Sequence, residues 1–208
     1  MSSLSADQEW ENFLNGDTLQ DSKNEIIYGN ETFIPKVTEI YISTQTKIGH
    51  LNQLIDLKTV FWDIPVISYQ SACSGVIKKQ MKFNSTSPEE VNDIVERKKQ
   101  YDYIDDYIIS QVNNDNGRNK FKDIRKISVG VCKKDITSYR CKEKSAFYNC
   151  FVLIVRLCND GIYKESHVKI FNTGKLELPG IQTEIGLNKC LDKVLEILNN
   201  QCKIDYYG

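Results

Sequence analysis

The chain has 208 residues, of which 40% are hydrophobic and 26% are charged, and its net charge is −1. A chain of this length forms one domain or two small ones, with enough apolar residues for a hydrophobic core. The near-zero charge excludes a global field that draws the chain to nucleic acid, so any nucleic-acid surface has to be local. No apolar run approaches the roughly 20 residues that span a bilayer, so we do not expect a membrane partner.

The N-terminal residues 1–35 are acidic and polar and lack periodicity, which predicts a flexible arm rather than a secretory signal. The seven cysteines form no CxxC pair, and neither histidine lies in a ligand motif. This pattern predicts an intracellular protein with reduced thiols and with no bound metal or other cofactor. The sequence contains no GxSxG, P-loop, HExxH or GxGxxG motif, so we do not expect an enzyme.

The first predicted strand is VTEIYISTQT, residues 37–46, which alternates and is rich in β-branched residues. A helix is predicted over residues 50–61. It ends at Pro65 at the latest, since proline cannot continue a helix. Residues 66–83 predict a second strand with a break near Gly75. The helix at 50–61 is predicted because Leu51, Leu54, Ile55 and Lys58 stand at helical spacing.

Residues from about 84 to 145 predict an insertion with a helical part and a basic part. Ser87 is a predicted N-cap, Pro88 takes the first helical position, and a thin apolar stripe extends the helix towards residue 112. In residues 122–144 the basic side chains outnumber the acidic ones. This stretch is either a solvated loop or a flank that tracks phosphates or docks a transcription partner.

The last third has the most regular pattern. It predicts a central strand at 147–157, a strand at 163–171, an NTGK turn and a short strand LELPG. Thr183 can cap a final helix with one apolar face. The order predicts an α+β fold, a curved antiparallel sheet with helices on one face and the other face open, in one domain over 36–202 with a tail at 203–208. The predicted apolar face of the helix consists of Leu187, Cys190, Leu191, Val194, Leu195 and Leu198.

Phe171 is the unusual residue of this region. Strand alternation places Val168 and Ile170 on one face, and His167, Lys169 and Phe171 on the other, polar face. A phenylalanine there is either covered by the insertion or exposed, and exposed aromatic side chains on an open sheet face indicate a binding surface.

KIFNTGKLELPG resembles the hairpin of the TATA-binding protein family, whose repeats carry a motif of the form I-F-x-[ST]-G-K-x-x-x-[TP]-G. VTEIYISTQT and the helix containing LIDLK resemble the opening strand and helix of a family repeat, and FVLIVRL stands where the family has its central strand. The resemblance covers about residues 37–83 and 146–200. It is closest to divergent, mimivirus-like members encoded by nucleocytoplasmic large DNA viruses.

The resemblance implies a lobe whose open sheet face docks in the DNA minor groove, where apolar wedges enter between base steps and kink the duplex. By motif position Phe171 matches a wedge, with Phe151 or Phe147 as its partner. The remaining implied DNA contacts are Arg156 and Lys175 to phosphates, Lys169, and Thr46 with Gln45 at the place of a family asparagine.

The function implied is that of a viral transcription initiation factor, which binds an A·T-rich promoter and recruits a transcription factor IIB-like protein or the viral RNA polymerase. It is expected in the viral factory, in the host nucleus or packaged in the virion. The IFxTGK pattern occurs once, so a second lobe is expected from a homodimer or from outside this chain. The alternative is a protein-interaction scaffold that keeps the fold without DNA binding, which Glu177 and the near-zero net charge favour.

Overall fold

The computed structural model describes residues 39–114, 116–117, 120–138, 147–159, 161–181 and 183–202. The predicted arm at 1–35 and tail at 203–208 lie outside these residues. All described helices and strands belong to one compact unit that begins at Ile42. The strands are β1 (Thr46–His50), β2 (Gly75–Ser85), β3 (Ile104–Asn113), β4 (Phe121–Gly130), β5 (Cys150–Asn159), β6 (Ile162–Phe171) and β7 (Lys175–Pro179). The helices are α2 (Leu57–Asp63), α3 (Pro88–Lys98), α4 (Lys133–Thr137) and α5 (Glu184–Cys202).

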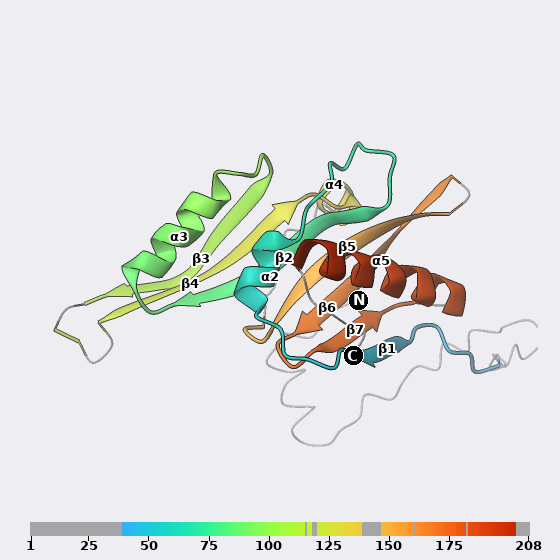
Figure 1. The fold of residues 1–208 in the computed structure, drawn as a ribbon, viewed down its shortest axis with the longest axis horizontal. Helices are drawn as coiled ribbons and strands as arrows, with labels where there is room; N and C mark the ends of the chain where they lie inside the picture. The colour runs from blue at the N-terminus through green and yellow to red at the C-terminus, as the bar shows by residue number, and fades with distance from the viewer. Residues whose placement is uncertain are drawn as a thin grey trace, which may run out of the picture. The chain divides into compact units, whose positions relative to one another are not determined.

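The strands form one curved antiparallel sheet in the order β1-β7-β6-β5-β2-β4-β3 (Figure 1). Helices α2, α3 and α5 contribute side chains to a single core on one face of this sheet. The α+β class and the helix-covered face predicted from the sequence are therefore confirmed. In the core, the Phe61 ring lies edge-on to Phe83 and Phe151, with centroid distances of 5.4 and 6.2 Å, a favourable aromatic geometry.

The first strand begins later than predicted. Residues 39–45 have no regular structure, and β1 starts at Thr46. The reason is its partner: β1 pairs only with the five residues of β7, from Thr46 opposite Pro179 to His50 opposite Lys175. Beyond Pro179 the Gly180 N–H still donates to the Gln45 carbonyl at 2.8 Å, but none of the described strands pairs with residues 39–45. Residues 39–45 alternate and include β-branched side chains, but they form no strand because no neighbouring strand pairs with them.

Helix α2 begins at Leu57 and not near residue 50, because Asp56 caps it. The Asp56 carboxylate accepts hydrogen bonds from the Lys58 backbone N–H at 3.1 Å and from the Thr59 hydroxyl at 2.6 Å. The bond from the Lys58 N–H, with a longer one from the Thr59 N–H at 3.5 Å, satisfies backbone groups that a helix start leaves without partners. The Thr59 hydroxyl bond, the largest contribution, lowers the pKa of Asp56.

The end of α2 is held by a buried lysine in β2. The Lys79 side chain is fully buried, and its ammonium group donates to the carbonyls of Ile64 at 2.6 Å and Trp62 at 3.2 Å. It also donates to the Tyr101 hydroxyl at 3.1 Å. A cation at a helix C-terminus satisfies carbonyls that lack helical partners. Lys79 thereby connects the helix layer to the centre of the sheet.

The insertion is part of the sheet. Helix α3 begins as predicted, with Ser87 accepting from the Glu90 N–H at 3.4 Å and Pro88 in first position, but it ends at Lys98. Residues 104–113, predicted as more helix, form β3, and residues 121–130 form β4. Tyrosine, isoleucine and valine favour a strand where a partner is present. The two strands extend the sheet beyond β2.

The strand predicted at 66–83 is correct only in its second half. Strand β2 starts at Gly75, where the break was expected, and residues 66–74, predicted as its first half, form a loop. Strands β5, β6 and β7 and the turn between β6 and β7 lie where the pattern placed them. Thr183 accepts from the Gly186 N–H at 3.2 Å at the start of α5. On the predicted apolar face, Cys190, Val194 and Leu198 are fully buried.

Gly174 in the NTGK turn should not tolerate a side chain. Its φ is +82°, and a Cβ there would lie 2.4 Å from the Gln53 carbonyl oxygen and 2.7 Å from that of Leu51. We expect Gly174→Ala to lower the free energy of unfolding by about 2 kcal/mol, because strain and a backbone clash coincide. Urea unfolding would measure this. Gly161→Ala, with a similar φ but open space around its Cβ, should cost less, and equal losses would contradict the clash.

Candidate nucleic-acid interface

The face of the sheet opposite the core helices carries Phe171. Residues directly opposite each other in antiparallel strands point to the same face. Lys169 lies opposite Val152 in β5 and Glu177 in β7, and Val152 lies opposite Gln80 in β2. Phe171 is two residues from Lys169 on β6 and therefore shares its face. The placement of Phe171 on the polar face beside the turn is confirmed.

The Phe171 ring is half-buried rather than fully exposed. The Lys175 ammonium nitrogen lies 5.0 Å from the ring centroid, within cation–π range. Lys175 follows the turn that Gly174 makes, so the turn brings charge and ring together. If a DNA duplex contacted the Phe171 ring, the Lys175 ammonium group would have to move away from the ring.

The two candidates for a second wedge, Phe151 and Phe147, differ in exposure. Phe151 lies opposite Ile170 and is fully buried in the helix-covered core, so its prediction as a DNA contact is wrong. Alternation places Cys150, also buried, opposite Phe171. Phe147 is 65% exposed just before β5. Of the two predicted partners, only Phe147 is at the surface.

Arg156 is a structural arginine, and its prediction as a phosphate contact is wrong. It is 6% exposed, and its guanidinium donates to the carbonyls of Tyr69 at 2.6 Å, Cys73 at 3.3 Å and Ser71. Arginine has five N–H donors in a fixed fork, which suits several carbonyls of one loop. Arg156 therefore holds the 66–74 loop against the sheet.

Lys169 and Lys175 both lie on the open face and share one carboxylate. Glu177 Oε2 is 3.2 Å from Lys169 Nζ, and Glu177 Oε1 is 2.7 Å from Lys175 Nζ. Hydrogen bonding from Lys175, the largest contribution, lowers the pKa of Glu177. Two ammonium groups and one carboxylate leave a charge of +1 on this trio. Glu177 is thus neutralised within the sheet.

Thr46 and Gln45 lie at the far edge of the sheet. Thr46 lies opposite Pro179 in β7, on the same face as Glu177, and is exposed. The Gln45 side chain is exposed, and its backbone carbonyl accepts from the Gly180 N–H at 2.8 Å. Both are open to solvent, at a distance of two strands from Phe171.

The structure adds two lysines that the sequence interpretation did not select. Lys82 in β2 lies directly opposite Lys126 in β4, on the open face. The Lys82 ammonium is 4.0 Å from the Tyr148 ring centroid. Alternation in VIKKQMKF does place Lys78, Gln80 and Lys82 on one face. The missing information was β4, because residues 121–130 were interpreted as a solvated basic loop or flank.

One end of the open face is covered. Ile77 and Ile154 form a small buried cluster there with Cys132, which precedes α4. Lys78 Nζ lies 2.7 Å from Asp135 Oδ1 in α4, which ties the helix to the strand. Burial, the largest contribution, raises the pKa of the Cys132 thiol. The other end of the face, around Phe171, Lys169, Lys175, Lys82 and Lys126, is the candidate interface.

In the described part of the chain, the basic stretch at 122–144 forms two different elements. Its first part is β4, where Asp123 and Arg125 are buried in a bidentate pair on the helix side. Residues 133–137 form α4, and residues 139–146 lie outside the described residues. The prediction of a solvated loop is therefore wrong for β4, whereas a contact of this stretch with phosphates or a partner stays a prediction.

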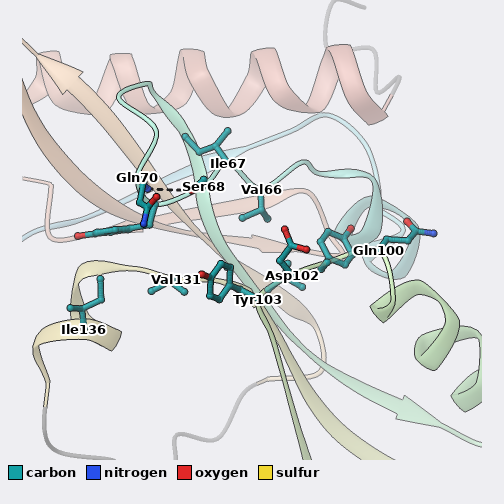
Figure 2. Close-up of a pocket in the computed structure, with 13 residues that line it drawn as sticks. Val66, Ile67, Ser68, Gln70, Gln100, Asp102, Tyr103, Val131 and Ile136 are labelled. Carbon is teal, nitrogen blue, oxygen red and sulfur yellow. Dashed lines mark hydrogen bonds between the residues drawn. The ribbon is translucent and has the colours of Figure 1, made fainter.

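A pocket of about 410 Å³ lies where the segments before β2 and before β3 approach the end of β4 (Figure 2). Three tyrosines contribute to its wall, and Tyr101 donates a hydrogen bond to the Trp62 carbonyl at 3.0 Å. Asp102 is its single acidic lining residue. The full lining is Val66, Ile67, Ser68, Tyr69, Gln70, Gln100, Tyr101, Asp102, Tyr103, Val129, Gly130, Val131 and Ile136.

Comparison with family models, with curated proteins and with solved structures finds no match to this chain. Among the described residues, no helix is long and apolar enough to cross a membrane. Within the same residues, no three His, Cys, Asp or Glu side chains gather in a way that would hold a metal ion.

Proposed function

We propose that the chain binds duplex DNA through the open sheet face, docking in the minor groove as a TATA-binding-protein-like transcription initiation factor of a large DNA virus. The observation that carries this proposal is the grouping of Phe171 with Lys169, Lys175, Lys82 and Lys126 on one face. An apolar ring among cations suits a ligand with stacked bases and a phosphate backbone. The chain order of strand, helix, central strand, hairpin and terminal helix also agrees with the resemblance to the TATA-binding protein family.

The electrostatics of this surface differ from those of the whole chain. The chain carries −1, yet this end of the face has four lysines, of which only Lys169 and Lys175 pair with Glu177. A local basic surface binds duplex by releasing condensed counterions, and each neutralised phosphate makes affinity fall as salt rises. A net-neutral protein can therefore bind DNA through one face without a global field.

The mechanism assigns separate roles to the ring and the amines. Phe171 would enter between base steps and partly unstack them, at a cost of a few kcal/mol that burial along the sheet offsets. Lys175 would move away from the Phe171 ring and contact a phosphate, and Lys169 would contact a phosphate beside it. Phe147, exposed before β5, is the available second wedge. Thr46 and Gln45 would contact the groove at the outer edge.

The proposed setting is viral transcription on an A·T-rich promoter, in the viral factory, the host nucleus or the virion. The outer surfaces of the helix layer would recruit a transcription factor IIB-like protein or the viral RNA polymerase. A second copy of the chain, or a lobe outside it, would complete the duplex contact.

The test is binding and bending of an A·T-rich duplex labelled at both ends for energy transfer. We expect the wild type to bind and bend it, and Phe171→Ala to lose bending more than affinity, because the lysines remain. Ile185→Ala removes an exposed apolar side chain on α5 and should change neither. Equal bending by wild type and Phe171→Ala would contradict the wedge.

A second candidate function is a protein-interaction scaffold without DNA binding. It is favoured by Glu177, which already pairs with Lys169 and Lys175. In that case the wild type binds no duplex even at low salt.

A further inference from the structure

We propose that the pocket of about 410 Å³ between the segments before β2 and before β3 binds a small organic cation, an amine whose ammonium group is attached to an apolar body. Asp102 and Tyr103, two neighbouring lining residues, would contact the ammonium group. Small-molecule sites usually have volumes of about 300–1,000 Å³, so the pocket is large enough for such a ligand. The pocket takes no part in the proposed binding of DNA.

The walls of the pocket are held in place by contacts of their own backbone. The Ile67 N–H donates to the Val76 carbonyl at 2.8 Å, and the Gly130 N–H donates to the Tyr103 carbonyl at 2.8 Å. Gly130 has a φ of +85°, and a Cβ there would clash with the Ile77 carbonyl oxygen. A glycine is therefore needed where the end of β4 approaches β2. Walls that are ordered before a ligand arrives lower the cost of binding it.

The charge of the lining favours a cation. Of the described residues that line the pocket, Asp102 alone has a charged side chain. No group of the described residues donates a hydrogen bond to its carboxylate or forms an ion pair with it. Figure 2 shows this carboxylate beside Tyr103 and directed towards the side of the pocket where Val66 lies. An anionic ligand would be repelled by the carboxylate, since no lysine or arginine lines the pocket to offset it.

The three tyrosines of the lining differ in what their rings already contact. The Tyr101 ring centroid lies 4.8 Å from the Lys79 ammonium nitrogen. The Tyr69 ring centroid lies 5.7 Å from the central guanidinium carbon of Arg156. Both cations donate to backbone carbonyls, and neither lines the pocket. Tyr103 is 68% exposed, and its ring is the one available to the ammonium group of a ligand through a cation–π contact.

The rest of the lining suits the apolar body of the ligand. Val66, Val131 and Ile136 contribute aliphatic side chains, and Ile136 is 60% exposed. Apolar atoms of a ligand that cover these side chains are removed from water together with them, which favours binding. A compact amine with one aromatic ring, such as 2-phenylethylamine, combines an ammonium group for Asp102 with an apolar body for this wall.

The test is titration of the full chain with 2-phenylethylamine, followed by the NMR chemical shifts of the backbone amides. We expect saturable shifts at the pocket residues, and Asp102→Asn should weaken the affinity about fivefold, the size of an exposed ion pair. Tyr103→Leu keeps an apolar side chain without a π face and should weaken it about threefold. Asp105→Asn removes the same charge on β3, outside the pocket. It is the matched control and should leave the affinity unchanged.

Two analogues with similar apolar bodies separate charge from shape. 2-Phenylethanol is neutral and 3-phenylpropanoate is anionic, and both should bind at least about fivefold more weakly than the amine. Equal affinities of the amine and the alcohol, or wild-type affinity in Asp102→Asn, would overturn the proposed cation site. The absence of shifts at the pocket residues at millimolar amine would overturn it as well. None of these results bears on duplex binding, because that proposal uses none of the residues of the pocket.

Discussion

Arg125→Met is expected to lower the free energy of unfolding by about 3–5 kcal/mol, because it leaves a buried carboxylate without its partner. Arg125 Nε and Nη2 bind the two oxygens of Asp123 at 2.6 and 2.7 Å, and Asp123 is fully buried. Arg125 Nη1 also lies 3.0 Å from Asp106, which in turn pairs with Lys98 of α3. The network connects the insertion's helix to its strands. Urea unfolding followed by circular dichroism measures the loss.

Two further variants show whether the charge left behind causes the effect. Asp123→Val combined with Arg125→Met removes both charges and should recover at least half of the loss, since apolar side chains replace a buried pair well. Lys99→Gln breaks an ion pair whose two side chains are about two-thirds exposed, and should cost well under 1 kcal/mol. A loss below 1 kcal/mol for Arg125→Met would contradict the account of the insertion as an integral part of the sheet.

Arg156→Ala is expected to lower the free energy of unfolding by about 3 kcal/mol, because it leaves loop carbonyls without a donor. Four carbonyls, those of Ser68, Tyr69, Ser71 and Cys73, accept from this one guanidinium. The Tyr163 and Tyr69 rings lie 5.3 and 5.7 Å from its central carbon. Loss of these contacts should release the 66–74 loop. Urea unfolding measures the loss of stability, and faster proteolysis within the loop reports its release.

Arg156→Lys distinguishes this structural role from a phosphate contact. Lysine keeps the charge but has no planar fork, so it should not restore stability. The salt dependence of duplex binding by the folded fraction should be unchanged in both variants. A stable Arg156→Lys protein, together with a less steep salt dependence in Arg156→Ala, would return Arg156 to the DNA-contact set.

The sequence predicted the elements that have a strong local signal. Gly174 and the NTGK turn located the β6–β7 hairpin, and Ser87 with Pro88 located the start of α3. The errors arose where long-range pairing decides the structure. Residues 104–113 form a strand because β4 is beside them, and residues 39–45 do not because β7 ends at Pro179.

The candidate site was predicted in part for the same reason. Phe171 and Lys169 were placed correctly because alternation within one strand fixes their face. Phe151 failed because the register pairs it with Ile170 and the core. Arg156 failed because its partners lie in the 66–74 loop, far away in the sequence. Lys126 was missed because its face is defined only by the pairing of β4 with β2.

The measurement that tests the central claim most directly is the affinity of the wild-type chain for an A·T-rich duplex across a salt series. Binding through the lysines of the open face predicts measurable affinity at low salt and a linear, steep fall of log affinity with log salt. The absence of binding at the lowest salt would contradict a duplex-binding function and leave the protein-interaction scaffold as the better account.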